Sequence, residues 1–148
     1  MFTSERSGIP QLYIKPVDGD ISPRLLVKSS SFQDQAAFSP DGSQMAFVAS
    51  HEGNSEIYII PFLPDSLQDI SNAKNLTKNP GGDFRPAFSP DGKYIAFSSD
   101  RGHKIVPHPQ FPFARQRIGD IYSMNIMGEQ LKRLTDSDSW DGSSVWAG

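Results

Sequence analysis

The chain has 148 residues, a formal net charge of −3 and no cysteine. An acidic balance without a clustered basic patch argues against a nucleic-acid surface, and no stretch approaches the roughly 18 apolar residues of a membrane span. A chain without cysteine has no disulfide or thiol chemistry. Polar residues begin at Thr3, so we expect no signal peptide within these residues.

Residues 1–30 have the pattern of an incomplete repeat unit. Phe2–Arg6 matches Phe97–Arg101 much later in the chain, so the chain is expected to begin in the middle of a strand. Two further strands are expected at Gln11–Lys15 and about Arg24–Lys28, joined through the turn-prone segment Val17–Asp20. The unit therefore lacks its first strand.

Residues 31–77 contain the first whole unit. Its Ser-Pro-Asp-Gly segment, residues 39–42, predicts a tight turn: proline fixes φ, aspartate bonds nearby backbone and glycine accepts a positive φ. The next strand, Gln44–Ala49, is apolar on both faces, which predicts a sheet that is covered on both sides. Two more strands follow at Glu56–Ile60 and Lys74–Thr77.

Residues 78–135 repeat this unit. Ala87–Asp100 is identical to Ala37–Ser50 at eight of fourteen positions, 50 residues later, and the two later strands recur as well. The second unit carries an insertion, Gly102–Ile118, because Phe97 and Ile121 lie 24 positions apart against ten in the first unit.

Residues 136–148 begin a further unit, with Trp146 at the place of Phe38 and Phe88. Four short antiparallel strands per unit, repeated with turns between them, predict a β-propeller. We therefore expect an all-β fold of four-stranded antiparallel blades, about three blades' worth in permuted order. Residues 1–30 form an incomplete blade, 31–77 and 78–135 whole blades, and 136–148 the first strand of another.

The repeated residues lead to a family. Phe-Ser-Pro-Asp-Gly, a strand ending in Ala-Phe, and then Ile-Tyr and Leu-Thr resemble the WD40-like repeat of TolB-type propellers. The resemblance covers nearly the whole chain outside the insertion Gly102–Ile118 and the lengthened connection Pro61–Ala73. The resemblance implies a propeller of six blades and, by analogy, a periplasmic location. Similar blades occur in prolyl-oligopeptidase-like and tricorn-like peptidases, so the motif specifies the fold but not the function.

Three blades cannot close a ring, and both outer sheets would show an apolar face to water. One interpretation is that the chain is a piece of a longer protein. The other is a homodimer in which Ser143–Trp146 of each copy completes the first blade of the other, giving six blades.

Candidate binding residues lie on the face formed by the loops after the second and fourth strands of each blade. They are Arg85, Arg101, His103, His108, Phe111, Phe113, Trp140 and Asp141. Structural alternatives exist for several of them: Arg101 pairing with a loop carboxylate, Trp140 filling the gap between blades, and Asp141 bracing a turn.

Catalytic and metal-binding patterns are missing from the sequence. There is no G-x-S-x-G elbow, no phosphate-binding glycine loop and no zinc-like set of ligands, and Asp136–Gly142 lacks the spacing of a calcium loop. We expect no metal or cofactor and a non-enzymatic module that binds a protein or peptide through its loop face. The rival hypothesis is a substrate-gating propeller of a prolyl-oligopeptidase-like or tricorn-like peptidase whose catalytic domain lies elsewhere.

Overall fold

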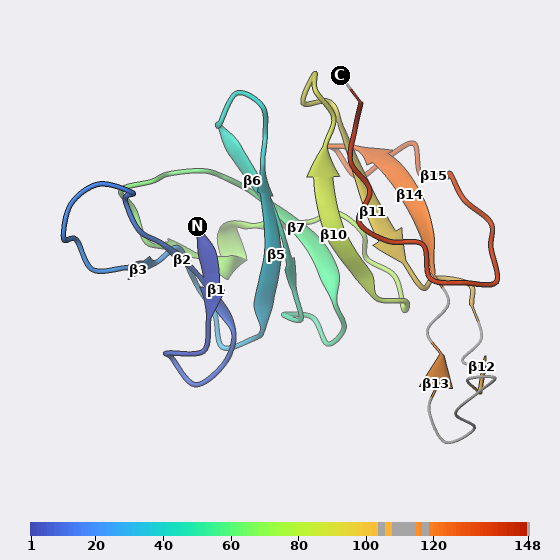
Figure 1. Cartoon of the computed structure of the whole chain (residues 1–148), viewed down its shortest axis with the longest axis horizontal. Helices are drawn as coiled ribbons and strands as arrows, with labels where there is room; N and C mark the ends of the chain where they lie inside the picture. The colour runs from blue at the N-terminus through green and yellow to red at the C-terminus, as the bar shows by residue number, and fades with distance from the viewer. Residues whose placement is uncertain (104–105, 108–114, 117–118, 148) are drawn as a thin grey trace.

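The computed structural model describes residues 1–103, 106–107, 115–116 and 119–147, which form short strands and one helical turn (Figure 1). Three antiparallel sheets carry the architecture. The first consists of β1 (Phe2–Ser4), β2 (Gln11–Ile14) and β3 (Arg24–Leu25). The second consists of β5 (Gln33–Phe38), β6 (Gln44–Ala49), β7 (Glu56–Pro61) and β9 (Lys74–Asn75). The third consists of β10 (Asp83–Phe88), β11 (Tyr94–Ser99), β14 (Asp120–Asn125) and β15 (Lys132–Arg133).

The remaining elements lie in the connections. They are the parallel pair β4 (Val27–Lys28) and β8 (Gln68–Asp69), the 3-10 helix Ile70–Asn72, and the pair β12 (Val106–Pro107) and β13 (Arg115–Gln116). Each main sheet keeps its strands in chain order. The predicted fold class, four-stranded propeller blades in permuted order, is therefore confirmed, whereas the blade boundaries at residues 30, 77 and 135 stay a prediction.

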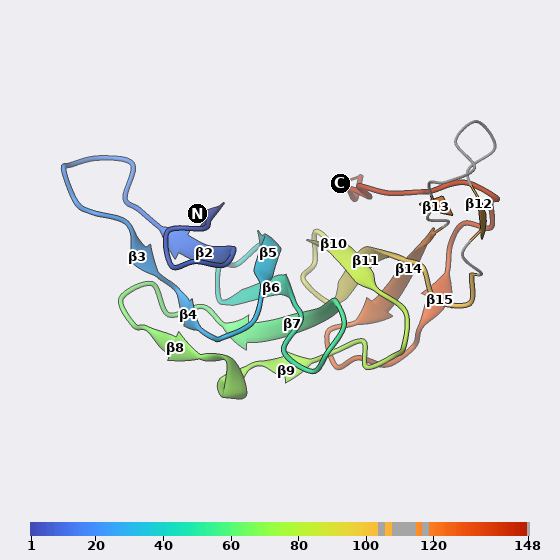
Figure 2. The same ribbon diagram turned by 90° about the horizontal axis from the view of Figure 1, so that it is seen from below.

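The sheets follow one another along an arc (Figure 2). The first strand of each sheet lies on the concave side, where β5 contacts β10 and β1 contacts β5. Both chain ends also lie on this side. The concave side thus corresponds to the wall of the central channel of a propeller.

The Ser-Pro-Asp-Gly turns form as the sequence predicts. The Ser39 hydroxyl donates to Asp41 Oδ1 at 2.6 Å, and the backbone N–H of Ser43 donates to the same oxygen at 3.0 Å. These bonds, the one from Ser39 first, lower the pKa of Asp41 to about 2. Gly42 has φ 71°, which a residue with a side chain adopts only with strain. The second copy repeats this geometry, with Ser89 donating to Asp91 at 2.6 Å.

The middle sheet is buried on both faces, which confirms the expectation for Gln44–Ala49. Alternate residues enter different cores: Met45 and Phe47 pack with Leu12 of the first sheet and with Leu26, which follows β3. Ala46 packs on the opposite face, in the core shared with the third sheet. Two separate apolar layers therefore join three sheets, and each layer needs both of its neighbours.

The C-terminal segment 141–147 has no regular secondary structure but shares one backbone feature with the first strands β5 and β10. Ser143 has φ 62°, against 52° for Gln35 and 55° for Arg85 at the same places in β5 and β10. In both of those strands the positive φ accompanies a register shift, the mark of a β-bulge. The Trp146 indole N–H donates to the Ala87 carbonyl at 2.9 Å and holds the segment beside β10.

We predict that Phe47→Ala lowers the free energy of unfolding by roughly 3–5 kcal/mol, because Phe47 is completely buried in the first layer. Phe38→Ala is the matched control, since the Phe38 ring is 38% exposed and its removal leaves a smaller cavity. Urea titration followed by circular dichroism measures both. Equal losses in the two variants would contradict the two-layer description.

Candidate functional site

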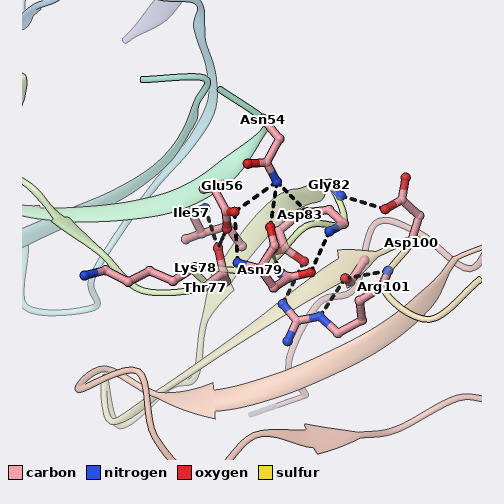
Figure 3. Close-up of polar contacts among 12 residues, drawn as sticks. Asn54, Glu56, Ile57, Thr77, Lys78, Asn79, Gly82, Asp83, Asp100 and Arg101 are labelled. Carbon is pink, nitrogen blue, oxygen red and sulfur yellow. Dashed lines mark hydrogen bonds and ion pairs between the residues drawn. The ribbon is translucent and has the colours of Figure 1, made fainter. Parts of the chain in front are cut away.

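One polar cluster lies in the seam between the second and third sheets, where the loop after β6 meets the loop before β10 (Figure 3). The Asp83 backbone N–H donates to the Ser55 carbonyl at 2.8 Å and links the two sheets directly. The Asn54 side chain donates to the carbonyls of Asn79 and Gly81 at 2.7 and 2.8 Å. These bonds fix the positions of two buried carboxylates, Glu56 and Asp83.

Glu56 is the first residue of β7 and is almost completely buried. It accepts hydrogen bonds from the side chain of Asn54 and the backbone N–H of Asn79, each at 3.0 Å, and from the Thr77 hydroxyl. Burial raises the pKa of Glu56 and the charge of Asp83 adds to the shift, while these hydrogen bonds oppose it. The net effect is a raised pKa of Glu56, so burial in the seam disfavours the ionised form of this side chain.

Asp83 begins β10 and is paired with Arg101. The Arg101 guanidinium donates to Asp83 Oδ1 at 2.8 Å, with the two side chains 14% and 0% exposed. The Asn79 side chain donates to the other oxygen at 2.6 Å. Arg101 also lies over the rings of Phe97 and Tyr122, 5.1 and 5.0 Å from their centroids. Arg101 thus has a structural role, which is the alternative that the sequence offered for it.

The first sheet repeats this arrangement without the carboxylate. Arg6 lies over the rings of Phe2 and Tyr13 at 5.3 and 4.7 Å and donates to the Ser4 hydroxyl at 3.0 Å, as Arg101 donates to Ser99 at 2.8 Å. Within the described part of the chain, no ion pair of Arg6 is found. Arg6 is exposed.

A second buried carboxylate cluster surrounds Asp120 at the start of β14. His103 Nε2 lies 2.5 Å from its Oδ2, and Arg133 donates to the same oxygen through Nε at 2.9 Å. Burial pushes the pKa of Asp120 upward, but the hydrogen bonds from His103 and Arg133 outweigh it and leave a lowered value. Arg133 also pairs with the exposed Asp136 at 2.7 Å.

Arg85 and Trp140 both lie against Gly142. A Cβ atom on Gly142 would come within 2.6 Å of the Trp140 indole nitrogen and 2.8 Å of Arg85 Nη1. The half-buried Trp140 ring packs edge-on against Phe84, with 5.8 Å between ring centroids. Arg85 is exposed, and its Nη1 donates to the Ser143 hydroxyl at 2.7 Å.

The predicted site residues therefore fall into separate groups. Arg85 and Trp140 come together with Gly142, whereas Arg101 and His103 each pair with a different buried carboxylate. Asp141 accepts from the Ser137 hydroxyl at 3.2 Å. His108, Phe111 and Phe113 lie outside the described residues, and the binding role of the whole set stays a prediction.

Sequence reasoning missed the buried carboxylates of the third strands. Gln11, Glu56 and Asp120 share one repeat position, and all three are buried. The alignment of Glu56–Ile60 with Asp120–Met124 contained that signal, because a polar residue at the start of an otherwise apolar strand needs a partner. Among the described residues, no group of three or more His, Cys, Asp or Glu could hold a metal ion, and no helix is long and apolar enough to cross a membrane.

Comparison with known proteins agrees with this geometry. The sequence matches the family described as "TolB beta propeller domain" over residues 22–111. The chain belongs to the TolB β-propeller family. The Tol-Pal system protein TolB of Bordetella pertussis is 39% identical to this TolB-family chain, covering 68% of it and 32% of the relative. The Tol-Pal system protein TolB of Francisella tularensis is 25% identical, over 84% of this chain and 25% of the relative.

Solved structures show the same fold. TolB from Acinetobacter baumannii matches 97% of this TolB-family chain with a TM-score of 0.70 and 25% identity, over 31% of its own length. The putative TolB from Agrobacterium tumefaciens matches 97% with a TM-score of 0.73 and 20% identity, over 48% of its own length. The chain spans about a third or less of the length of the curated relatives just described.

We predict that Glu56→Gln flattens the dependence of stability on pH. A carboxyl whose folded-state pKa is raised contributes stability at pH values below the ordinary glutamate pKa of 4.5 and loses that stability as pH rises through the folded-state pKa. The amide has no such loss, and Gln11 already occupies the same place in the first sheet. Urea unfolding from pH 4 to pH 8 compares the two proteins; identical slopes would contradict the raised pKa.

We predict that Arg101→Ala costs about 3–5 kcal/mol of unfolding free energy, because it leaves the buried carboxylate of Asp83 without its cation. Arg85→Ala is the control. It removes an exposed guanidinium whose described side-chain partner is a hydroxyl, so a loss below roughly 1 kcal/mol is expected. Comparable losses would show that the Asp83 ion pair does not stabilise the seam.

Proposed function

We propose that this chain is a non-enzymatic TolB-like propeller module that binds a protein or peptide through its loop face. Its relatives from Bordetella and Francisella carry the name Tol-Pal system protein, which supports a role beside other Tol-Pal components and a periplasmic location. Their names do not support the rival hypothesis of a substrate-gating peptidase propeller. A catalytic function also has no support in the seam, where Glu56 and Asp83 are engaged by donors of the chain.

The observation that carries this proposal is the exposed guanidinium of Arg85, the third residue of β10, which lies on the concave side just after the loop that precedes this strand. It lies beside a shallow groove between the first strands and the C-terminal segment. The groove is lined by Gln35, Ala36, Arg85, Pro86, Ala87, Ser143, Ser144 and Val145. A cation next to small apolar side chains suits an extended peptide that carries a carboxylate, which an arginine binds through two parallel hydrogen bonds.

Trp140 lies next to the same surface, because it and Arg85 both approach Gly142. Tryptophan, arginine and phenylalanine are enriched among residues that dominate binding energy, and the insertion Gly102–Ile118 supplies two phenylalanines outside the described residues. Because Trp140 packs on Phe84, its replacement would disturb the fold. Arg85 is the better probe of binding.

The expected homodimer concerns other surfaces, the two outward sheet faces, and is also a proposal.

We predict that Arg85→Glu weakens binding of a purified Pal component at least tenfold, about 1.4 kcal/mol, because it reverses the charge that meets the ligand carboxylate. Lys15→Glu makes the same charge change at an exposed residue on the opposite loop face and should leave binding unaltered. Isothermal titration calorimetry measures both. Equal affinities of wild type and Arg85→Glu would reject Arg85 as the contact.

A further inference from the structure

We infer that the first seam, the contact between the first and second sheets, contains a binding site for a small ligand with one carboxylate and an apolar body. Arg24, at the start of β3, binds the carboxylate, and the apolar body lies against Ile21 and Pro64. The site shares no lining residue with the groove beside Arg85, so it is independent of the proposed function.

A cavity of about 290 Å³ lies at one end of this seam, where β3 and the connection between β7 and β9 come together (Figure 2). Ligand pockets typically enclose roughly 300–1,000 Å³, so this cavity suits a small molecule. Its apolar lining includes Ile14 and Ile21 from the side of the first sheet and Pro64 from the connection. Ile14 packs against the first core, whereas Ile21 is 56% exposed. A ligand body would cover apolar surface that the chain leaves open.

The second seam, between the second and third sheets, shows how the same place is filled elsewhere in the chain. Arg24 lies opposite Ile14 in the β2–β3 pair. Lys74 lies opposite Ile59 in the β7–β9 pair, which is the same repeat position. The Lys74 ammonium donates to the carbonyl of Met127 at 2.7 Å, in the short connection between β14 and β15. In the second seam the cation is thus bonded to the backbone of the next sheet.

The first seam differs because the corresponding connection is longer. Twelve residues separate β7 from β9, whereas six separate β14 from β15. The long connection is fixed near both ends of the part that borders the cavity. The Phe62 ring packs edge-on against Phe38, 4.6 Å between centroids, and the Gln68 backbone N–H donates to the Leu26 carbonyl at 3.1 Å. The chain itself therefore holds both walls of the cavity.

Arg24 has no partner of the kind that Lys74 has. It is half-buried, and within the described part of the chain it forms no ion pair and no side-chain hydrogen bond. Arg101 and Arg133, by contrast, each pair with a buried carboxylate. A guanidinium binds a carboxylate through two parallel hydrogen bonds. Arg24 is therefore the group of the cavity that is available to an anion.

The charges around the cavity favour a monoanion. Its charged lining residues are Lys15, Arg24 and Asp65, two cations and one carboxylate, so the lining has a net charge of +1. One carboxylate on the ligand balances this charge, whereas a second would meet the like charge of Asp65. An uncharged ligand would cover the guanidinium without giving it an acceptor, which costs free energy.

Titration of the isotopically labelled chain with 4-phenylbutyrate, followed by heteronuclear NMR, tests the site. This probe has one carboxylate and an apolar body, so we expect saturable shifts of the backbone N–H signals of Ile21 and Asp65. The alcohol 4-phenylbutanol keeps the body without the charge and should bind at least tenfold more weakly. Equal binding of the alcohol would overturn the assignment of an anion. No saturable shift at millimolar 4-phenylbutyrate would overturn the site.

Variants test the assigned contact. Arg24→Gln should weaken binding of 4-phenylbutyrate at least tenfold, because the amide has neither the charge nor the paired donors of the guanidinium. Lys28→Gln is the matched control: it removes the same charge from an exposed residue of β4 that does not line the cavity, and should bind as wild type. Wild-type binding by Arg24→Gln, or equal losses in the two variants, would overturn the contact. The NMR spectrum of each variant shows whether it is folded.

Asp65→Asn tests the charge balance from the other wall. It should strengthen binding about twofold to fivefold, because it removes an exposed carboxylate that repels the ligand anion. Weaker binding by Asp65→Asn would show that the ligand needs this carboxylate and would overturn the monoanion.

The same carboxylate chemistry could come from a free acid or from the last residue of a peptide. A tetrapeptide that ends in phenylalanine separates these sources, measured in the Arg85→Glu variant so that the groove does not contribute. Tighter binding of the peptide than of 4-phenylbutyrate would assign the cavity to a chain terminus, and weaker binding supports a free small acid. Binding of 4-phenylbutyrate itself should be unaltered in Arg85→Glu. The binding of a Pal component is tested separately, so either proposal can fail without the other.

Discussion

The structure depends on one repeated contact, the packing of a Phe–Tyr pair from one sheet against the aliphatic face of the sheet before it. Phe47 with Tyr58 and Phe97 with Tyr122 both make it. A four-stranded sheet this short has no core of its own, so its stability comes from the neighbours that cover it. The arc of the sheets places the first strands on the concave side, and with them every residue of the groove.

The seams differ in their polar residues although their apolar layers are alike. In the first seam two neutral side chains are buried, Gln11 and Gln33, and Gln33 bonds the backbone of Leu12 in β2 and of Val27 in β4. In the second seam Glu56 and Asp83 replace them and need Arg101 to balance the charge. Replacing amides by carboxylates makes a seam sensitive to pH and to the loss of a single cation. The repeat thus conserves the shape of the contact between sheets while its electrostatics change from seam to seam.

Much of the fold could be predicted because its signals are local. The Ser-Pro-Asp-Gly turn depends only on residues that are adjacent in sequence. The strand Gln44–Ala49 has apolar residues on both faces, and this pattern alone predicts that both faces are buried. The sequence offered a carboxylate as a partner for Arg101 but could not say which one, because Asp83 and Arg101 meet only through the register of β10 and β11. The positive φ of Gln35 and Arg85 could not be predicted from the sequence either. Residues other than glycine seldom adopt a positive φ, and here it accompanies a β-bulge. For the candidate site, the sequence located the loops but not the partners of their side chains.

These partners decide which candidate residues remain available to a ligand. A guanidinium that neutralises a buried carboxylate cannot leave it without a large loss of stability, so Arg101 belongs to the fold. His103 is held by Asp120 in the same way. The Arg85 guanidinium bonds a hydroxyl, that of Ser143, among the described residues and stays exposed, so exchanging this bond for a ligand carboxylate removes no support from the core. In a scaffold whose sheets are stable only together, binding specificity has to reside in such side chains, because those that join the sheets are already engaged.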